Sequence, residues 1–286
     1  DQYYHRHIKP EDSNRISKSW IRDMVAKYGK DSSVVKVRCL GEFADTEENQ
    51  LITLEWLQAA RDKEFVEDGS IPRFRISADI ADGGLNETVI VASRQYDSFD
   101  HWIKLRRYNF PPARAPILAA EAAINMFKEF DGNKNEDDLV IDGLGVGAGT
   151  CGAIIHKGYN TVRYIGGSTE GVDTEKYRNT RVQSHMVMRD RLRDGQVVIA
   201  DDFCEDDEDW EDFEGQMCSI KSKPGMGKLE DLLTKAEILR LGIKSPDMPD
   251  ACSEIYAMQV PELITGDEPF VIIGELESAQ YEGIAI

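Results

Sequence analysis

The spacing of apolar residues in the middle of the chain changes several times between two periods. Short apolar runs bounded by glycine and proline indicate strands, whereas apolar residues three and four positions apart indicate helices. On these rules we expect strands at residues 74–81, 88–93, 101–108, 139–141, 161–165 and 196–200. The same rules predict helices at 113–130, about 150–157, 175–193, 230–241 and from 249 onward. Strands that alternate with helices in this way are typical of an α/β protein with a mixed central sheet.

The first 70 residues are more polar than the region that follows. They contain two short helical patterns, at 17–28 and 53–65, and no motif that indicates chemistry. The character of the sequence changes at Pro72, where the strand-rich region begins. We therefore expect a helical arm that precedes the α/β region, which is consistent with a length of 286 residues.

Charge and cysteine usage exclude several classes of protein. The chain has 34 basic and 53 acidic residues, a net charge of −19, which argues against a surface that coats nucleic acid everywhere. Ten of the acids lie within residues 201–214, which we interpret as a solvated loop, with a DNA mimic or a cation-rich rim as alternatives. Five scattered cysteines without a C-x-x-C pair exclude a disulfide framework and a cysteine-rich zinc site. No apolar run approaches the length of a membrane span.

Two aspartates end predicted strands and are followed by glycines. Asp79 lies near the end of the strand predicted at 74–81, and Asp142 directly follows the strand at 139–141. In open α/β sheets the ligand crevice lies at the carboxyl ends of the strands, so parallel neighbours would bring these carboxylates together. Two close carboxylates are stabilised by a divalent cation, and oxygen-only ligands favour Mg²⁺ or Mn²⁺. The alternative is that each aspartate only caps a turn.

A third acidic motif begins the last predicted helix. Asp247 and Asp250 are three residues apart, with Pro249 suited to the first helical turn. Acids at this position also stabilise the helix dipole, which is the structural alternative. Acids on two strands and one helix nevertheless form an arrangement that could bind two metal ions. Two ions bound in this way would activate a water and stabilise the leaving oxygen of a phosphodiester.

Taken together, these motifs resemble the nuclease domain of the large terminase subunit of tailed double-stranded DNA bacteriophages. The resemblance is carried by residues 28–32 and 37–43, which are similar to the stretch joining the ATPase motor to the nuclease, and by residues 79–84 with 87–90, 140–147, 177–181 and 242–251. The resemblance implies a ribonuclease H-like mixed sheet flanked by helices, with an N-terminal helical or linker arm. It also implies a metal-dependent endonuclease that cuts concatemeric viral double-stranded DNA with little sequence specificity.

By the same resemblance, Asp79 and Asp142 are the first two metal ligands. Asp247 or Asp250 is the third, and we slightly prefer Asp247 as the direct ligand and Asp250 as a second ligand or an outer partner. Two Mg²⁺ or Mn²⁺ ions are implied. One departure is that many relatives have a further aspartate six or seven residues after the first, where this chain has Leu85 and Asn86.

The resemblance also divides the chain and suggests partners. Residues 1–70 would be the end of the ATPase motor domain and the linker, 71–262 the nuclease domain, and 263–286 an acidic tail. No G-x-x-x-x-G-K-[ST] motif is found, so the chain is expected to be a fragment beginning at the end of the motor domain. The implied partners are double-stranded DNA, the small terminase subunit and the portal, with no membrane, in the host cell cytoplasm and outside the mature virion.

Basic residues suggest how DNA would be held. Lys221, Lys223 and Lys228 lie in the loop before the last helices, and Arg181 lies on the helix predicted at 175–193. Phosphate contacts from such side chains position DNA without reading its sequence. His185 is expected on the surface of the same helix.

Three alternative functions remain open from the sequence. An actin-like or sugar-kinase-like phosphotransferase would use the same superfold, but it requires a duplicated core. A docking domain without activity would not require the three acidic motifs to converge. Finally, residues 147–152 match G-x-G-x-x-G and would suit a dinucleotide, although Asp142 would repel a pyrophosphate and a tight turn needs the same small residues.

Overall fold

The computed structural model describes residues 16–30, 32–42, 49–83, 86–224, 229–241 and 245–257. Its helices are α1 (Lys18–Tyr28), α2 (Ser33–Leu40), α3 (Leu54–Asp62), α4 (Ala115–Glu129), α5 (Val146–His156), α6 (Thr180–Arg193), α7 (Asp207–Ser219), α8 (Lys235–Arg240) and α9 (Asp247–Glu254), with a 3₁₀ turn at Pro112–Arg114. Its strands are β1 (Arg73–Asp79), β2 (Thr88–Gln95), β3 (Asp100–Tyr108), β4 (Asp138–Asp142), β5 (Thr161–Tyr164), β6 (Val197–Ile199), β7 (Ser222–Pro224) and β8 (Glu230–Leu232).

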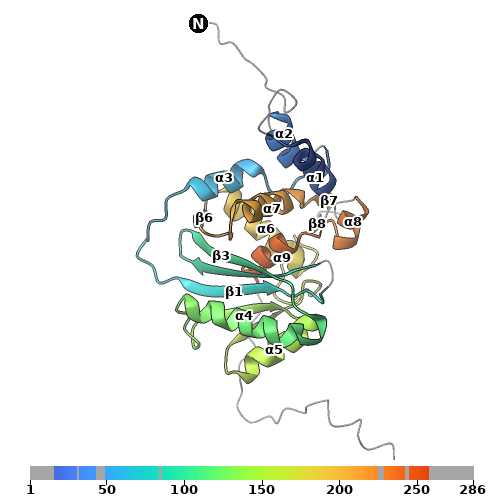
Figure 1. The fold of residues 1–286 in the computed structure, drawn as a ribbon. Helices are drawn as coiled ribbons and strands as arrows, with labels where there is room; N and C mark the ends of the chain where they lie inside the picture. The colour runs from blue at the N-terminus through green and yellow to red at the C-terminus, as the bar shows by residue number, and fades with distance from the viewer. Residues whose placement is uncertain are drawn as a thin grey trace, which may run out of the picture.

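Six of the strands form one central sheet in the order β5-β4-β1-β2-β3-β6 (Figure 1). The hairpins make β2 antiparallel to both β1 and β3, whereas β4 pairs in parallel with β1 and β5, and β6 pairs in parallel with β3. The sheet is therefore mixed, as expected from the sequence. Strands β7 and β8 form a separate antiparallel hairpin.

The two faces of the sheet are covered by different helices because successive strand residues point to opposite faces. On β2, Ile90 and Ala92 join a core with α4 and α5, while Val89 and Val91 join a larger core with α6, α7 and α9. Figure 1 shows this layering, with α4 and α5 below the sheet and α9, α7 and α6 above it.

The acidic stretch at 201–214 is not a solvated loop, and that prediction is wrong. Its second half forms the beginning of α7, with Asp206 as N-cap and three acids in the first turn, where they stabilise the helix dipole. Trp210, Phe213 and Met217 recur at helical spacing and are buried against the core. The apolar spacing was present in the sequence, but the density of charge obscured it.

Other predicted helices also differ from the structure: α5 begins at Val146 and α9 at Asp247, each a few residues earlier than expected, and two differ more strongly. The helix predicted at 175–193 begins only at Thr180, because Asn179 caps it and accepts a hydrogen bond from the Val182 backbone N–H. The helix predicted at 230–241 is instead strand β8 followed by the short helix α8, which starts with a capping box between Thr234 and Glu237.

The N-terminal helices pack against the same core as α7. Met24, Tyr28, Val35 and Leu57 from α1, α2 and α3 are buried in the cluster that contains Phe213. The described part of residues 16–62 is therefore joined to the α/β region by apolar packing.

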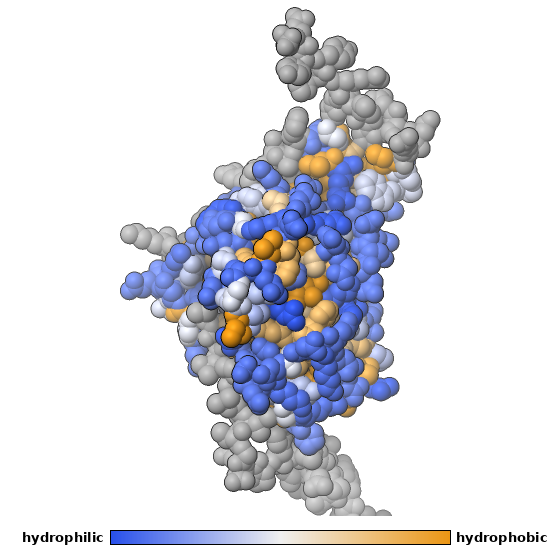
Figure 2. Space-filling model, turned by 90° about the vertical axis from the view of Figure 1, so that its left-hand side faces the viewer, coloured by the Kyte–Doolittle hydropathy of each residue, from blue (hydrophilic) through white to orange (hydrophobic). Residues whose placement is uncertain are grey.

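Hydrophilic side chains cover most of the face of the molecule that Figure 2 shows. Figure 2 shows one face on which apolar side chains gather near the middle of a hydrophilic surround. Val66 and Ile71, in the connection between α3 and β1, are among the exposed large apolar residues. Within the described part of the chain, none of the helices has the length and apolar character needed to cross a membrane.

Candidate active site

The carboxyl ends of β1 and β4 bring Asp79 and Asp142 to the same edge of the sheet. The two strands are parallel, with Ala78 opposite Ile141, and each aspartate is the next residue along its strand. Since Ala78 and Ile141 face α4 and α5, the two aspartates face the opposite side of the sheet, toward α9. Asp79 is buried and Asp142 is half-buried.

Helix α9 brings three further acids to this edge. It lies against β1, where the Ser77 hydroxyl donates a hydrogen bond of 2.7 Å to the Ala251 carbonyl. Asp247, Asp250 and Glu254 are all buried on this helix. The expected convergence of the three acidic motifs is thus present, with Glu254 as a fourth acidic element.

Asp79, Asp142, Asp250 and Glu254 border a cavity of about 250 Å³. Its lining residues are Asp79, Asp142, Leu144, Tyr164, Gly166, Gly167, Asn179, Arg181, Lys235, Asp250 and Glu254. Asp247 does not line it. The cavity is a candidate active site because its acidic lining comes from two strands and one helix.

Asp247 and Asp250 have different surroundings. Asp247 Oδ1 accepts a hydrogen bond of 2.6 Å from the Ser245 hydroxyl, and Oδ2 lies 3.5 Å from the Glu87 backbone N–H. Asp250 Oδ1 lies 3.1 Å from Arg181 Nε and 3.2 Å from His185 Nε2, and its second oxygen is directed toward Lys235. The geometry therefore favours Asp250 over Asp247 as the acid that faces the cavity, the reverse of the order slightly preferred from the sequence.

The Lys235 ammonium lies among these acids. Its Nζ is 3.0 Å from Asp79 Oδ2, 3.1 Å from Asp250 Oδ2 and 3.7 Å from Asp247 Oδ1. Burial opposes the charged ammonium, but the neighbouring carboxylates outweigh it and raise the pKa of Lys235. Lys235 is the first residue of α8, and its side chain is 42% exposed, so the charge that it supplies sits at the border of the site.

Asp79, Asp142 and Glu254 are stabilised in their neutral form. Burial, with the nearby charges of Asp250 and Asp247, raises the pKa of Asp79 to about 7, although Lys235 opposes the shift. Burial and repulsion from Asp79 and Asp142 raise the pKa of Glu254 well above its usual range. Burial also raises the pKa of Asp142. Positive charge is thus insufficient to ionise all of these carboxylates together.

Asp250 is the exception because two cationic groups face it. Although burial opposes ionisation, Arg181 and Lys235 hold the pKa of Asp250 well below its usual range. His185, predicted on the helix surface, is instead fully buried, and its Nδ1 lies 2.9 Å from the Arg181 carbonyl. Burial lowers the pKa of His185. The Arg181 Nε–H donates to Asp250 Oδ1 and therefore fixes the orientation of that carboxylate.

The residues of the cavity fit a hard divalent cation. Their donors are carboxylate oxygens, which Mg²⁺ and Mn²⁺ prefer. Glu254 Oε2 is buried without a hydrogen-bond partner among the described residues. In the same described ranges, no three His, Cys, Asp or Glu side chains are already arranged around one point as a metal site. Asp79, Asp142, Asp250 and Glu254 are the side chains that would have to close around an ion.

The basic residues suggested by the sequence are distributed unequally. Arg181 and Lys223 line a second cavity next to the acids. Lys221 lines a small separate cavity beside Tyr28 and Gly215. Lys228 lies outside the described residues.

The glycine run after Asp142 serves local packing. A Cβ on Gly147 would overlap the carbonyl oxygen of Asp142, so only glycine allows α5 to begin this close to the end of β4. This close approach explains a glycine at 147 by the tight turn alone, without a dinucleotide.

Known proteins were compared with the chain by sequence and by structure. No protein-family model matches it, and no curated protein sequence matches it. The nuclease domain of the large terminase subunit gp2 of bacterial virus Sf6 is similar to 74% of this chain over 100% of its own length, with 20% identity and a TM-score of 0.58. A mutant of that domain, with manganese and beta-thujaplicinol, matches with the same identity, coverage and TM-score.

The chain has the fold of a terminase nuclease domain. The ribonuclease H-like fold class expected from the sequence is thereby confirmed. A large terminase from a thermophilic bacteriophage also matches, at 12% identity over 88% of this chain and 54% of its own length, with a TM-score of 0.47.

Three residues of the candidate site were missed in the sequence. Glu254 follows Asp250 by four positions, so helical periodicity placed it on the same face of α9. His185 likewise follows Arg181 by four positions on α6. No sequence pattern indicates a role for Lys235, because only the tertiary structure places the start of α8 next to the end of β1 and next to α9.

Proposed function

We propose that the chain is a divalent-metal-dependent endonuclease that cuts double-stranded DNA during the packaging of a viral genome. The observation that carries the proposal is the convergence of Asp79, Asp142 and Asp250 in one cavity, beside Glu254, on the fold of a terminase nuclease domain. The related Sf6 domain with manganese supports a divalent cofactor.

Each acid of the cavity has a role in this proposal. Asp79, Asp142 and Asp250 would hold two Mg²⁺ or Mn²⁺ ions, with Glu254 as an additional ligand and Asp247 as a neighbour that braces the start of α9. When bound, the ions would supply an activated water and stabilise the leaving oxygen of the phosphodiester. Arg181 orients Asp250, and Lys235 neutralises part of the acidic charge near the DNA.

Substrate and partners follow from the same proposal. We expect cutting with little sequence preference, because phosphate contacts position DNA without reading its bases. Residues 1–70 would include the linker from a motor domain, residues 71–262 the nuclease and 263–286 an acidic tail. The small terminase subunit and the portal are proposed partners, and the host cell cytoplasm the proposed location. The phosphotransferase alternative lacks support. It requires two copies of the α/β domain, each with its own central sheet, whereas the described residues form one six-stranded sheet.

Cleavage of supercoiled plasmid tests this function. The protein should nick and linearise plasmid with Mn²⁺ or Mg²⁺, and excess chelator should stop it. Asp142→Asn should abolish cleavage, whereas the control Asp97→Asn, an exposed aspartate at the β2–β3 turn, should cut like the parent protein. Cleavage that persists in excess chelator, or in Asp142→Asn, would contradict the proposal.

A further inference from the structure

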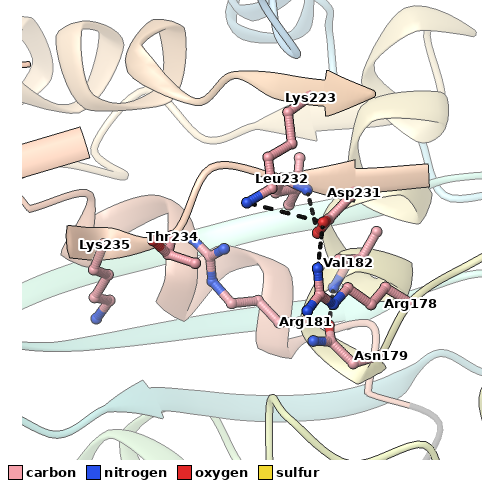
Figure 3. Close-up of a pocket in the computed structure, with 9 residues that line it drawn as sticks. All are labelled: Arg178, Asn179, Arg181, Val182, Lys223, Asp231, Leu232, Thr234 and Lys235. Carbon is pink, nitrogen blue, oxygen red and sulfur yellow. Dashed lines mark hydrogen bonds and ion pairs between the residues drawn. The ribbon is translucent and has the colours of Figure 1, made fainter. Parts of the chain in front are cut away.

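A second cavity, of about 320 Å³, has the lining residues drawn in Figure 3 and adjoins the acidic cavity. The start of α6 encloses it on one side, and the β7–β8 hairpin with its connection to α8 encloses it on the other. Asn179, Arg181 and Lys235 line both cavities, so the two are adjacent. A ligand that leaves the acidic cavity in this direction would enter the second one.

The lining of the second cavity is strongly basic. Among the described residues it contains Arg178, Arg181, Lys223 and Lys235 but only one acid, Asp231. This excess of positive charge stands out in a chain with a net charge of −19. The side chains come from three different elements, so tertiary folding and not a local run of basic residues produces it. Such a cavity selects an anionic ligand.

Asp231 provides the negative charge in the cavity. Arg178 Nη1 donates a hydrogen bond of 2.8 Å to Asp231 Oδ2, and Lys223 Nζ lies 3.9 Å from the same oxygen (Figure 3). Lys223 also pairs with Glu237 at 2.9 Å. Asp231 itself is buried and is fixed by the Leu232 backbone N–H. The two basic side chains are thus held around an anion supplied by the protein.

The basic side chains retain capacity for a further anion. The Arg178 side chain is 59% exposed, and its guanidinium has five N–H donors. Arg181 Nη2 is buried and has no hydrogen-bond partner in the part of the chain that the structure describes. The α6 side of the cavity therefore combines an exposed and a buried donor.

We propose that this cavity binds a backbone phosphate of the DNA strand, adjacent to the phosphate that is cut. The proposal rests on the proposed nuclease function, and it assigns Arg178 and Lys223 as positioning residues for the substrate. Asp231 keeps both side chains in place without DNA and opposes the incoming phosphate by repulsion. Phosphates follow one another about every 3.4 Å along the axis of one strand, so a strand bound at the acids also reaches its neighbouring cavity.

Binding of a fluorescent duplex in excess chelator tests the assignment without cleavage. Affinity is measured over a range of salt concentrations for the parent protein, Arg178→Ala and Lys223→Ala. Each substitution should weaken binding roughly three- to tenfold and reduce the magnitude of the salt slope by about 0.9, the value of one lost phosphate contact on duplex DNA. The matched control is Arg193→Ala, at the other end of α6, where a 46% exposed arginine pairs with Asp194 and Asp190.

A third variant, Asp231→Asn, should change the affinity for DNA in the opposite direction. Asp231→Asn should strengthen binding, because it removes the repelling charge while the amide oxygen still accepts from Leu232 N–H. Unchanged or weaker binding by folded Asp231→Asn would refute the role of Asp231. Should that variant fail to fold, the salt slopes of Arg178→Ala and Lys223→Ala still decide the cavity assignment.

The same preparations separate this inference from the proposed function. If Arg178→Ala and Lys223→Ala have the affinity and slope of Arg193→Ala while the parent cuts plasmid with Mn²⁺, the cavity assignment is wrong and the nuclease function stands. If the slopes fall as expected but the parent never cuts, the cavity binds phosphate and the nuclease function is wrong. A parent protein that neither binds nor cuts DNA overturns both.

Discussion

The molecule has two concentrations of acidic residues, and they are neutralised in different ways. In the α7 acidic segment (residues 201–219), the buried acids meet fixed cationic or hydroxyl partners. Asp212 accepts a hydrogen bond of 2.7 Å from Tyr28 and pairs with Lys27 at 2.8 Å and with Arg107 at 3.1 Å. Glu214 pairs with Arg38 from α2.

The acidic cavity has much less fixed positive charge. Glu254 has a buried oxygen without a partner among the described residues, and Asp79 pairs with Lys235, whose side chain is nearly half exposed. The comparison shows that acidic composition alone does not indicate function. A candidate metal site is distinguished by buried carboxylates that have too few cationic side chains beside them. Such carboxylates are stabilised when a metal ion binds.

The same substitution, aspartate to asparagine, should have opposite effects on cleavage and on melting temperature in the two acidic regions. Asp79→Asn should lower the cleavage rate at least about 10³-fold, equivalent to roughly 4 kcal/mol of barrier, because a proposed metal ligand is lost. Its melting temperature in chelator should hold or rise, since crowded buried charge is relieved. Asp212→Asn should do the opposite, with cleavage retained and the melting temperature lowered. Unfolding of Asp79→Asn would instead assign Asp79 a structural role.

Arg107 on β3 pairs with acids of the α7 acidic segment, and its removal should have the largest effect on the free energy of unfolding. Arg107 contacts Asp209 at 2.6 Å and Asp212 at 3.1 Å and also pairs with Glu87. Arg107→Ala should lower the free energy of unfolding by about 3–5 kcal/mol, because Asp212 stays buried without that partner. Arg106→Ala on the same strand, which breaks a pair with the 45% exposed Glu129, should cost at most about 1 kcal/mol. Equal losses in urea titrations would contradict the distinction.

The acidic cavity should also determine how the stability of the metal-free protein depends on pH. The pKa of Asp79 is raised to about 7, so between about pH 4 and pH 7 the folded state binds more protons than the unfolded state. Stability should therefore fall as the pH rises through this range, by roughly 2–3 kcal/mol after allowance for solvent screening near Lys235. The fall should be smaller in Asp79→Asn. Urea titrations in chelator at pH 4.5 and pH 7.5 measure it, and a rise with pH would contradict the sign.

The smallest effect concerns how the N-terminal arm meets α7. A Cβ on Gly215 would overlap the ring of Tyr28, so Gly215→Ala should lower the free energy of unfolding by about 1–2 kcal/mol. Gly152→Ala, in α5 where a Cβ meets no described atom within 4 Å, should be neutral or stabilise by about 0.5–1 kcal/mol. Thermal melts of both variants measure the difference. A more stable Gly215→Ala would contradict the close packing of Tyr28 against Gly215.

Much of the fold could be predicted because its signals are local. The six strands of the central sheet and the helices α4 and α5 follow from apolar periodicity, and Asp79 and Asp142 from their places at strand ends. The acidic segment was misinterpreted since its helical apolar spacing lies among ten acids. Lys235 and the contact between Asp250 and His185 could not be predicted, because they depend on how α6, α8 and α9 pack together.

A crystal structure of the protein soaked with Mn²⁺ tests the central claim most directly, because anomalous scattering locates the ion without any assay of cleavage. Mn²⁺ should appear in the acidic cavity, bound by Asp79, Asp142 and Asp250, with the Lys235 ammonium displaced from between them. An acidic cavity that stays free of Mn²⁺ at saturating concentration, with Lys235 still paired to Asp79, would contradict the account.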